Sequence, residues 1–149
     1  MPVEITRLGA GKKYQAAALG KIAGALLAAL KQSRSELSIA LVGDREMRRL
    51  NARYRKKNQT TDVLSFVVAD QPKSAVVVLG DVVISVEQAR RQAKARKTTL
   101  ESEMVTLLIH GTLHLLGYDH ERSSRQARIM FAFERKLHRR LCDQGLLKV

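Results

Sequence analysis

Three of the four histidines lie within eleven residues, in the segment 110–120, and this spacing constrains the fold more than any other feature of the chain. His110 and His114 are four residues apart, so in a helix both side chains leave the same face, about one turn apart. Gly117 follows, and glycine is well suited to end a helix and reverse the chain, which brings His120 toward the other two. The sequence therefore predicts a helix and turn that present three imidazoles to one metal ion.

The segment has the ligand spacing of the metzincin pattern H-E-x-x-H-x-x-G-x-x-H, with one change. Gly111 stands where that pattern has the glutamate that serves as general base, so the spacing predicts the ligands but disfavours protease chemistry by that route. Three neutral imidazoles without a thiolate suit one zinc ion per chain, and nickel and cobalt are also compatible. Three protein ligands leave a coordination position open, where water on zinc has a pKa of about 7, so hydrolysis is the expected chemistry.

Two histidines four residues apart on a buried helix are often core residues satisfied by hydrogen bonds. A third buried histidine makes that interpretation energetically unfavourable, because each buried polar group left without a partner costs about 1 to 3 kcal/mol. Asp119 and Glu121 flank the third histidine and are candidates to accept an imidazole N–H or to act as a base, although either is equally interpretable as a surface carboxylate. His138 lies among cations, which predicts a surface or RNA-facing residue rather than a ligand.

The net charge of +13 indicates a polyanionic partner, with nucleic acid the leading class; the alternative is that the charge only keeps the protein soluble. One basic cluster precedes a polar loop and comprises Arg53, Arg55, Lys56 and Lys57. These cations are candidates for RNA binding, although the dipole at a helix C-terminus favours them equally well for structural reasons. We predict that Arg55 stabilises a phosphate, because the planar guanidinium group matches the geometry of the phosphate oxygens. Composition alone does not select it over Arg53.

The length of 149 residues predicts one domain, and periodicity assigns its elements. We expect strands at 3–8, 36–42, 63–69 and 75–85, the last two forming a hairpin, and helices at 12–33, from Asp44 onward, after Ser85, at 99–116 and at 124–144. Met47, Leu50 and Tyr54 would form the buried side of the second helix. The longest apolar run, 22–30, is far short of the roughly 20 residues of a membrane span. With no signal-peptide pattern and a single cysteine, Cys142, a cytoplasmic protein is expected.

Three parts of the chain together resemble the YbeY family, bacterial metal-dependent endoribonucleases of ribosomal RNA maturation and small-subunit quality control. They are Arg55 with the segment 61–66, the segment 79–85 and the histidine segment 110–120. The resemblance implies an α+β domain in which a small mixed four-stranded sheet packs against about five helices, one of them a zincin-like metal helix. It also implies a zinc-like ion on His110, His114 and His120, and a functional arginine at Arg55.

For function, the resemblance implies cleavage of single-stranded RNA near the 3′ end of the maturing small-subunit RNA, with ribosomal RNA and the small subunit as partners. The family loop commonly reads R-x-x-D-x-P-T, whereas this chain has Asn58 in place of the acid and Thr60 in place of the proline. Two alternatives remain. One is a non-catalytic ribosome-assembly factor whose structural zinc holds the last two helices together. The other is a metallopeptidase with a base other than residue 111, which the positive charge disfavours.

Overall fold

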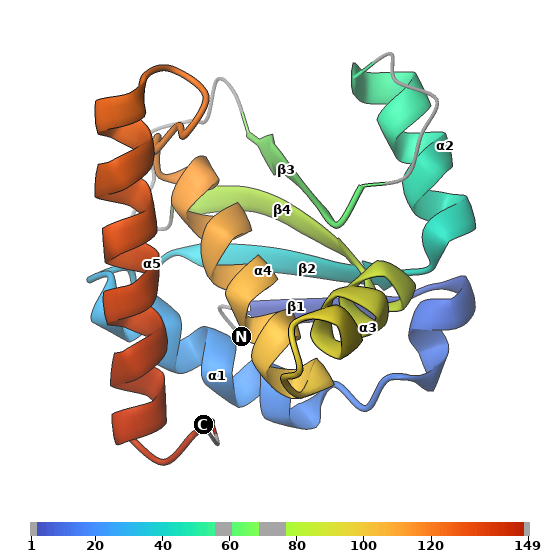
Figure 1. Ribbon diagram of the computed structural model, residues 1–149, viewed down its shortest axis with the longest axis horizontal. Coiled ribbons are helices and arrows are strands. Elements are labelled where there is room, and N and C mark those ends of the chain that lie inside the picture. The colour runs from blue at the N-terminus through green and yellow to red at the C-terminus, as the bar shows by residue number, and fades with distance from the viewer. Residues whose placement is uncertain (1–2, 56–60, 69–76, 148–149) are drawn as a thin grey trace.

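The computed structural model describes residues 3–55, 61–68 and 77–147, with the backbone but not the side chain of Arg55 (Figure 1). In chain order the elements are β1 (Val3–Arg7), the 3-10 helix η1 (Gly9–Lys13), α1 (Ala17–Ala29), β2 (Glu36–Val42), α2 (Asp44–Arg55), β3 (Val63–Val67), β4 (Val78–Ser85), α3 (Val86–Ala95), α4 (Leu100–Leu115) and α5 (Ser124–Asp143). None of the helices in this described part of the chain is long and apolar enough to cross a membrane.

The four strands form one mixed sheet in the order β1-β2-β4-β3. The first three are parallel, and β3 runs antiparallel to β4, with Val63 opposite Ile84 and Val67 opposite Gly80. The predicted pairing of these last two strands is confirmed, although both are shorter than expected and residues 69–76 lie outside the described segments. The α+β class with a small mixed sheet and five α-helices is therefore confirmed.

Alternate side chains of each strand point to opposite sides of the sheet, so both faces carry apolar residues. Other elements cover these residues on each face. One face contributes to a large core shared with α1, α3, α4 and α5, and its sheet residues include Leu37, Ile39, Val82 and Ile84. The other face carries a smaller cluster, in which Val42, Leu64 and Val83 pack around Met47 of α2. Helix α4, which carries His110 and His114, packs on the first of these two faces.

The prediction that Tyr54 is buried is wrong. Its side chain lies near the end of α2 and is 55% exposed, with its ring edge-on to that of Phe66 at 5.2 Å between centroids. Met47 is fully buried and Leu50 is partly buried, so the apolar side of α2 covers the sheet along only part of the helix.

Side-chain caps set the starts of three helices. Ser85 accepts a hydrogen bond from the Gln88 amide at the start of α3, Thr99 accepts one from the Ser102 amide at the start of α4, and Ser123 caps α5. The starts after Ser85 and at Ser124 are as predicted, and the helix predicted from residue 99 begins at Leu100, with Thr99 as its cap. Helix α1 begins at Ala17 rather than at residue 12, because residues 9–13 form the separate helix η1.

Candidate metal centre

Helix α4 carries two of the three histidines and ends close to Gly117, as the sequence predicts. Gly117 has a φ of 100°, a backbone angle that residues other than glycine rarely adopt. Its amide donates to the His114 carbonyl at 3.0 Å, and the Tyr118 amide donates to the Leu113 carbonyl at 3.1 Å. This pair of bonds is a Schellman turn, which satisfies carbonyls at the helix end and reverses the chain. The turn directs His120 back toward α4.

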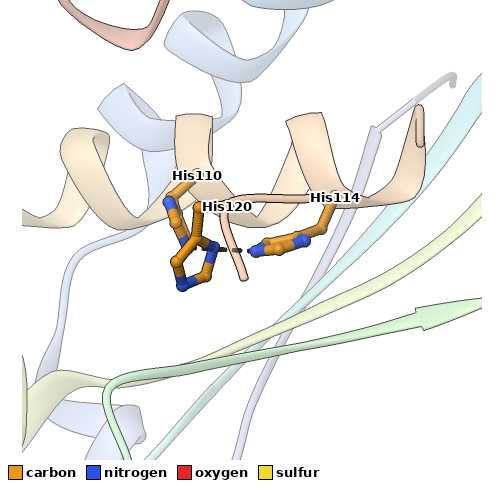
Figure 2. Close-up of side chains that lie close together, drawn as sticks. All are labelled: His110, His114 and His120. Atoms are coloured by element: carbon orange, nitrogen blue, oxygen red, sulfur yellow. Dashed lines mark hydrogen bonds between the residues drawn. The ribbon is translucent and has the colours of Figure 1, made fainter. Parts of the chain in front are cut away.

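The three imidazoles meet as the sequence predicts (Figure 2). One ring nitrogen from each histidine lies within 4.8 Å of the others, and the ring centroids are 4.6 to 5.1 Å apart. The Nε2 atoms of His110 and His114 are 3.1 Å apart. Two nitrogens on one tetrahedral zinc ion would be about 3.3 Å apart, so the observed separation is close to that of a ligand pair. The three histidines are positioned to hold a metal ion.

The hydrogen bonds of the rings also fit a metal. The Nδ1 atom of His120 is buried and has no hydrogen-bond partner among the described residues, as expected of a nitrogen reserved for an ion. His110 Nδ1 lies 2.8 Å from Oε1 of Glu134 in α5. With the proton on Nδ1 donated to this carboxylate, the Nε2 lone pair is directed to the metal, the usual arrangement around a histidine ligand.

Glu134 is the functional residue that sequence reasoning misses. It lies 24 residues beyond His110, on a different helix, and no spacing rule links the two positions. The sequence instead points to the carboxylates that flank His120. Asp119 accepts a hydrogen bond from the Glu121 amide at 2.9 Å, and Glu121 Oε1 is 3.9 Å from His120 Nε2, beyond hydrogen-bond distance. A role for either as a base stays a prediction.

The surroundings of His114 favour its neutral imidazole. Burial lowers the pKa of His114, and the positive charge that His110 and His120 would carry if protonated lowers it further. Neutral imidazole is the form that binds a metal, so the site is prepared for an ion near neutral pH.

The three imidazoles line a cavity of about 420 Å³, and the edge strand β3 lines it too. Val63, Ser65 and Val67 of β3 contribute to it together, because alternate residues of a strand share a face. Asp62, just before the strand, also lines the cavity, and its carboxylate accepts hydrogen bonds from the Val63 amide at 2.8 Å and from Gln92 Nε2 at 3.2 Å. A substrate that enters here would lie between β3 and the three histidines.

Gly111 lies on the side of α4 that packs against the sheet. A Cβ atom at this position would be 2.7 Å from Val82 Cγ1 and 3.1 Å from Val63 Cγ2. Ser65 Oγ donates to the Gly111 carbonyl at 2.9 Å and links the helix to β3. Glycine therefore permits the close packing of α4 on the sheet, and a glutamate does not fit at this position without a shift of the helix or of the side chains that face it.

The other predicted residues lie apart from the three histidines or outside the described residues. His138 has its Nε2 3.3 Å from Ser102 Oγ and its Nδ1 3.8 Å from Cys142 Sγ, and it is not part of the metal cluster. Arg53 is exposed, with its guanidinium 5.4 Å from the centre of the Tyr54 ring. The Arg55 side chain, Lys56 and Lys57 lie outside the part of the chain that the structure describes.

Comparison with known proteins gives a consistent family assignment. The family model described as Endoribonuclease YbeY matches residues 9–142. A relative of that name from Myxococcus xanthus is 52% identical over 127 residues, which are 84% of this chain and 42% of the relative. Another, from Geobacter metallireducens, is 42% identical over 132 residues, covering 87% of this chain and 88% of the relative. The solution structure of a Thermotoga maritima protein matches with a TM-score of 0.67 and 26% identity, over 96% of this chain and 91% of that one.

The relatives differ in length. The matched region spans less than half of the Myxococcus xanthus protein and 60% of the Anaeromyxobacter dehalogenans protein, which is 50% identical. The similarity to those two proteins therefore concerns only the matched part of each.

Proposed function

Because this chain belongs to the YbeY family of endoribonucleases, we propose that it is a metal-dependent endoribonuclease that cleaves single-stranded RNA. The observation that carries the proposal is the cluster of three imidazoles that faces the cavity along β3. A net charge of +13 favours the approach of a polyanion, and phosphodiester cleavage needs mainly charge stabilisation at the reacting phosphate.

Each residue of the metal centre has a proposed role. His110, His114 and His120 hold one ion, with zinc the first choice and nickel or cobalt compatible with the same ligands. When bound, zinc would supply a nucleophile at neutral pH by lowering the pKa of coordinated water to about 7. Glu134 orients His110 and keeps its proton on Nδ1.

The cations before β3 would act on the RNA. Arg55 stabilises the charge on the phosphate, because its planar guanidinium forms two parallel hydrogen bonds to phosphate oxygens. Arg53, Lys56 and Lys57 contact the RNA backbone beside it. Arg55 is the last residue of α2, and the chain continues from it into the segment that leads to β3 and the cavity.

The proposed substrate is ribosomal RNA, at the 3′ end of the maturing small-subunit RNA, with a role in ribosome quality control. This assignment rests on the resemblance of Arg55, the segment 61–66 and the histidine segment to the family pattern. The small ribosomal subunit would be the partner, and the cytoplasm the place of action.

Metal analysis of the purified protein, paired with an RNA cleavage assay, tests the proposal. The wild-type protein should carry one ion per chain and cleave a single-stranded RNA with the small-subunit 3′ precursor sequence, but not the same sequence in a duplex. His114→Ala should lose both the ion and cleavage. Arg55→Ala should keep the ion and cleave at least about tenfold more slowly, since one charge-assisted contact in the transition state is lost.

Arg90→Ala is the matched control for Arg55→Ala, because it removes one exposed arginine from α3, outside the metal centre. It should cleave like the wild type. A fully loaded wild-type protein that does not cleave RNA, together with a His114→Ala variant that loses thermal stability and ribosome binding, would instead establish the assembly factor with a structural zinc. Cleavage of peptides but not RNA would establish a peptidase.

A further inference from the structure

A second concavity lies on the side of α4 that faces α5. Helices α4 and α5 lie side by side (Figure 1). Residues of both helices form the walls of an open groove of about 840 Å³. Ser102 and Thr106 of α4 lie on one wall, and Arg135 and Arg139 of α5 on the other. Arg96 lines the groove near the start of α4, away from the histidines at the other end of that helix. The volume is within the range of sites that hold a nucleotide-sized ligand.

The groove adjoins the metal centre through two residues of α5. Glu134 lines the groove and also contacts His110 Nδ1 at 2.8 Å. Phe131 lines the groove too, and its ring centroid is 5.9 Å from that of His120. A flexible chain that leaves the metal centre past these two side chains therefore enters the groove.

The charges in the groove favour an anion. Glu103 is 2% exposed and accepts from Arg96 at 2.7 Å, and Glu134 is engaged with His110, so two of the three lining carboxylates are already paired. Within the described residues, Arg135 and Arg139 make no ion pair. Two guanidinium groups one helical turn apart present donors that match successive phosphate oxygens.

The groove also offers an aromatic surface. Phe131 is 41% exposed, at the end of the groove near the histidines, and the buried Ile109 lines the same groove. An exposed aromatic ring beside unpaired arginines is the combination that binds single-stranded nucleic acids, because the ring stacks on a base while the cations follow the backbone.

We propose that the groove between α4 and α5 binds the single-stranded RNA segment that flanks the bond held at the metal centre. Arg135 and Arg139 contact its phosphates, and Phe131 stacks on the base that leaves the metal centre. The proposal rests on the proposed function, to which it adds a subsite beyond the cavity along β3.

Binding of a nuclease-resistant oligouridylate of about ten nucleotides, followed by fluorescence anisotropy, tests the subsite separately from cleavage. Arg135→Ala/Arg139→Ala should raise Kd about tenfold and reduce the slope of log Kd against log salt by about 1.4, since about 0.7 is lost per phosphate contact. Lys136→Ala/Arg140→Ala removes the same charge from exposed positions of α5 outside the groove and should change Kd less than about twofold.

The stacking contact has its own pair of variants. Phe131→Leu should weaken binding about fivefold or more, and Phe131→Tyr, which keeps an aromatic face, should bind like the wild type. In the cleavage assay the arginine variant should raise KM for long RNA and leave kcat and metal content unchanged, which a merely structural role would not do.

Equal effects of the two double variants would overturn the subsite, since they would reflect general charge alone. Unchanged binding in both would also overturn it. Groove-dependent binding without any RNA cleavage by the loaded wild type would refute the proposed nuclease and leave the subsite standing. Cleavage of long RNA with an unchanged KM in the groove variant would refute the subsite and leave the nuclease standing.

Discussion

His110 and Gly111 are neighbours in sequence, and they show how differently two sides of α4 are built. The side of His110 faces a cavity, where half-buried imidazoles have room to adjust around an ion. The side of Gly111 packs against Val82 so closely that one methyl group would clash. The first side serves chemistry and the second serves the packing of helix on sheet. Changes on the two sides should therefore be separable: one set alters metal binding, the other alters folding.

The largest expected effect is on the metal side. His114→Ala removes one of three ligands and should weaken zinc binding by more than about a hundredfold, beyond the loss caused by changing an outer partner of a ligand. The metal-free variant should unfold in urea within about 1 kcal/mol of the metal-free wild type, because no close packing is lost. Zinc titration and urea denaturation in chelator measure the two quantities. A large loss of stability without metal would show that the two sides are not separable.

Glu134→Gln should have the next largest effect. Glutamine keeps the size of the side chain but not its charge, so the imidazole of His110 is held less firmly in the orientation that binds the ion. We expect zinc affinity to fall about tenfold to a hundredfold. Competition with a metal indicator dye measures it, and Glu121→Gln, on an exposed side chain beyond hydrogen-bond distance of His120, is the control that should bind zinc normally.

Gly111→Ala tests the packing side. The added methyl group meets Val82 Cγ1 at 2.7 Å, and overpacking of this kind costs about 1 to 3 kcal/mol of unfolding free energy. Gly24→Ala is the matched control, because Gly24 lies inside α1 with no atom within 4 Å of an added Cβ. That change should stabilise the protein by about 0.5 to 1 kcal/mol. If Gly111→Ala unfolds like the wild type, α4 is packed less tightly on the sheet than the distances indicate.

The smallest effect is a pH dependence confined to the metal side. Burial lowers the pKa of His114 in the folded protein, so as the pH falls below about 6.5 the unfolded chain takes up a proton that the folded chain resists. The metal-free wild type should therefore lose stability between about pH 7 and pH 5.5, and His114→Ala should lose less. Urea denaturation at the two pH values measures the difference. Zinc occupancy should fall over the same interval, because protonated imidazole does not bind metal.

Features that depend on a few neighbouring residues could be predicted from the sequence. The helix starts after Ser85 and near Thr99, the turn at Gly117 and the clustering of the three histidines all arise within segments of eleven residues or fewer. Their hydrogen bonds and helical spacing are local, so the residue types alone are informative.

Features that depend on packing between distant elements could not be predicted. Glu134 reaches His110 only because α5 packs against α4, and a lone acid among arginines carries no sign of that contact. Tyr54 has the helical spacing of Met47 and Leu50, but periodicity does not show how far the facing sheet extends along a helix. The requirement for glycine at residue 111 likewise emerges only when the distance to Val82 is known.

The short span of the three histidines also bears on the order of folding. All three come from eleven consecutive residues, and the Schellman turn at Gly117 closes the loop that joins them. Closing so short a loop costs little chain entropy, and local contacts form faster than the pairing of β2 with the distant β4. The three ligands of one ion are therefore brought together by local chain geometry, and their approach to one another needs no pairing of distant strands.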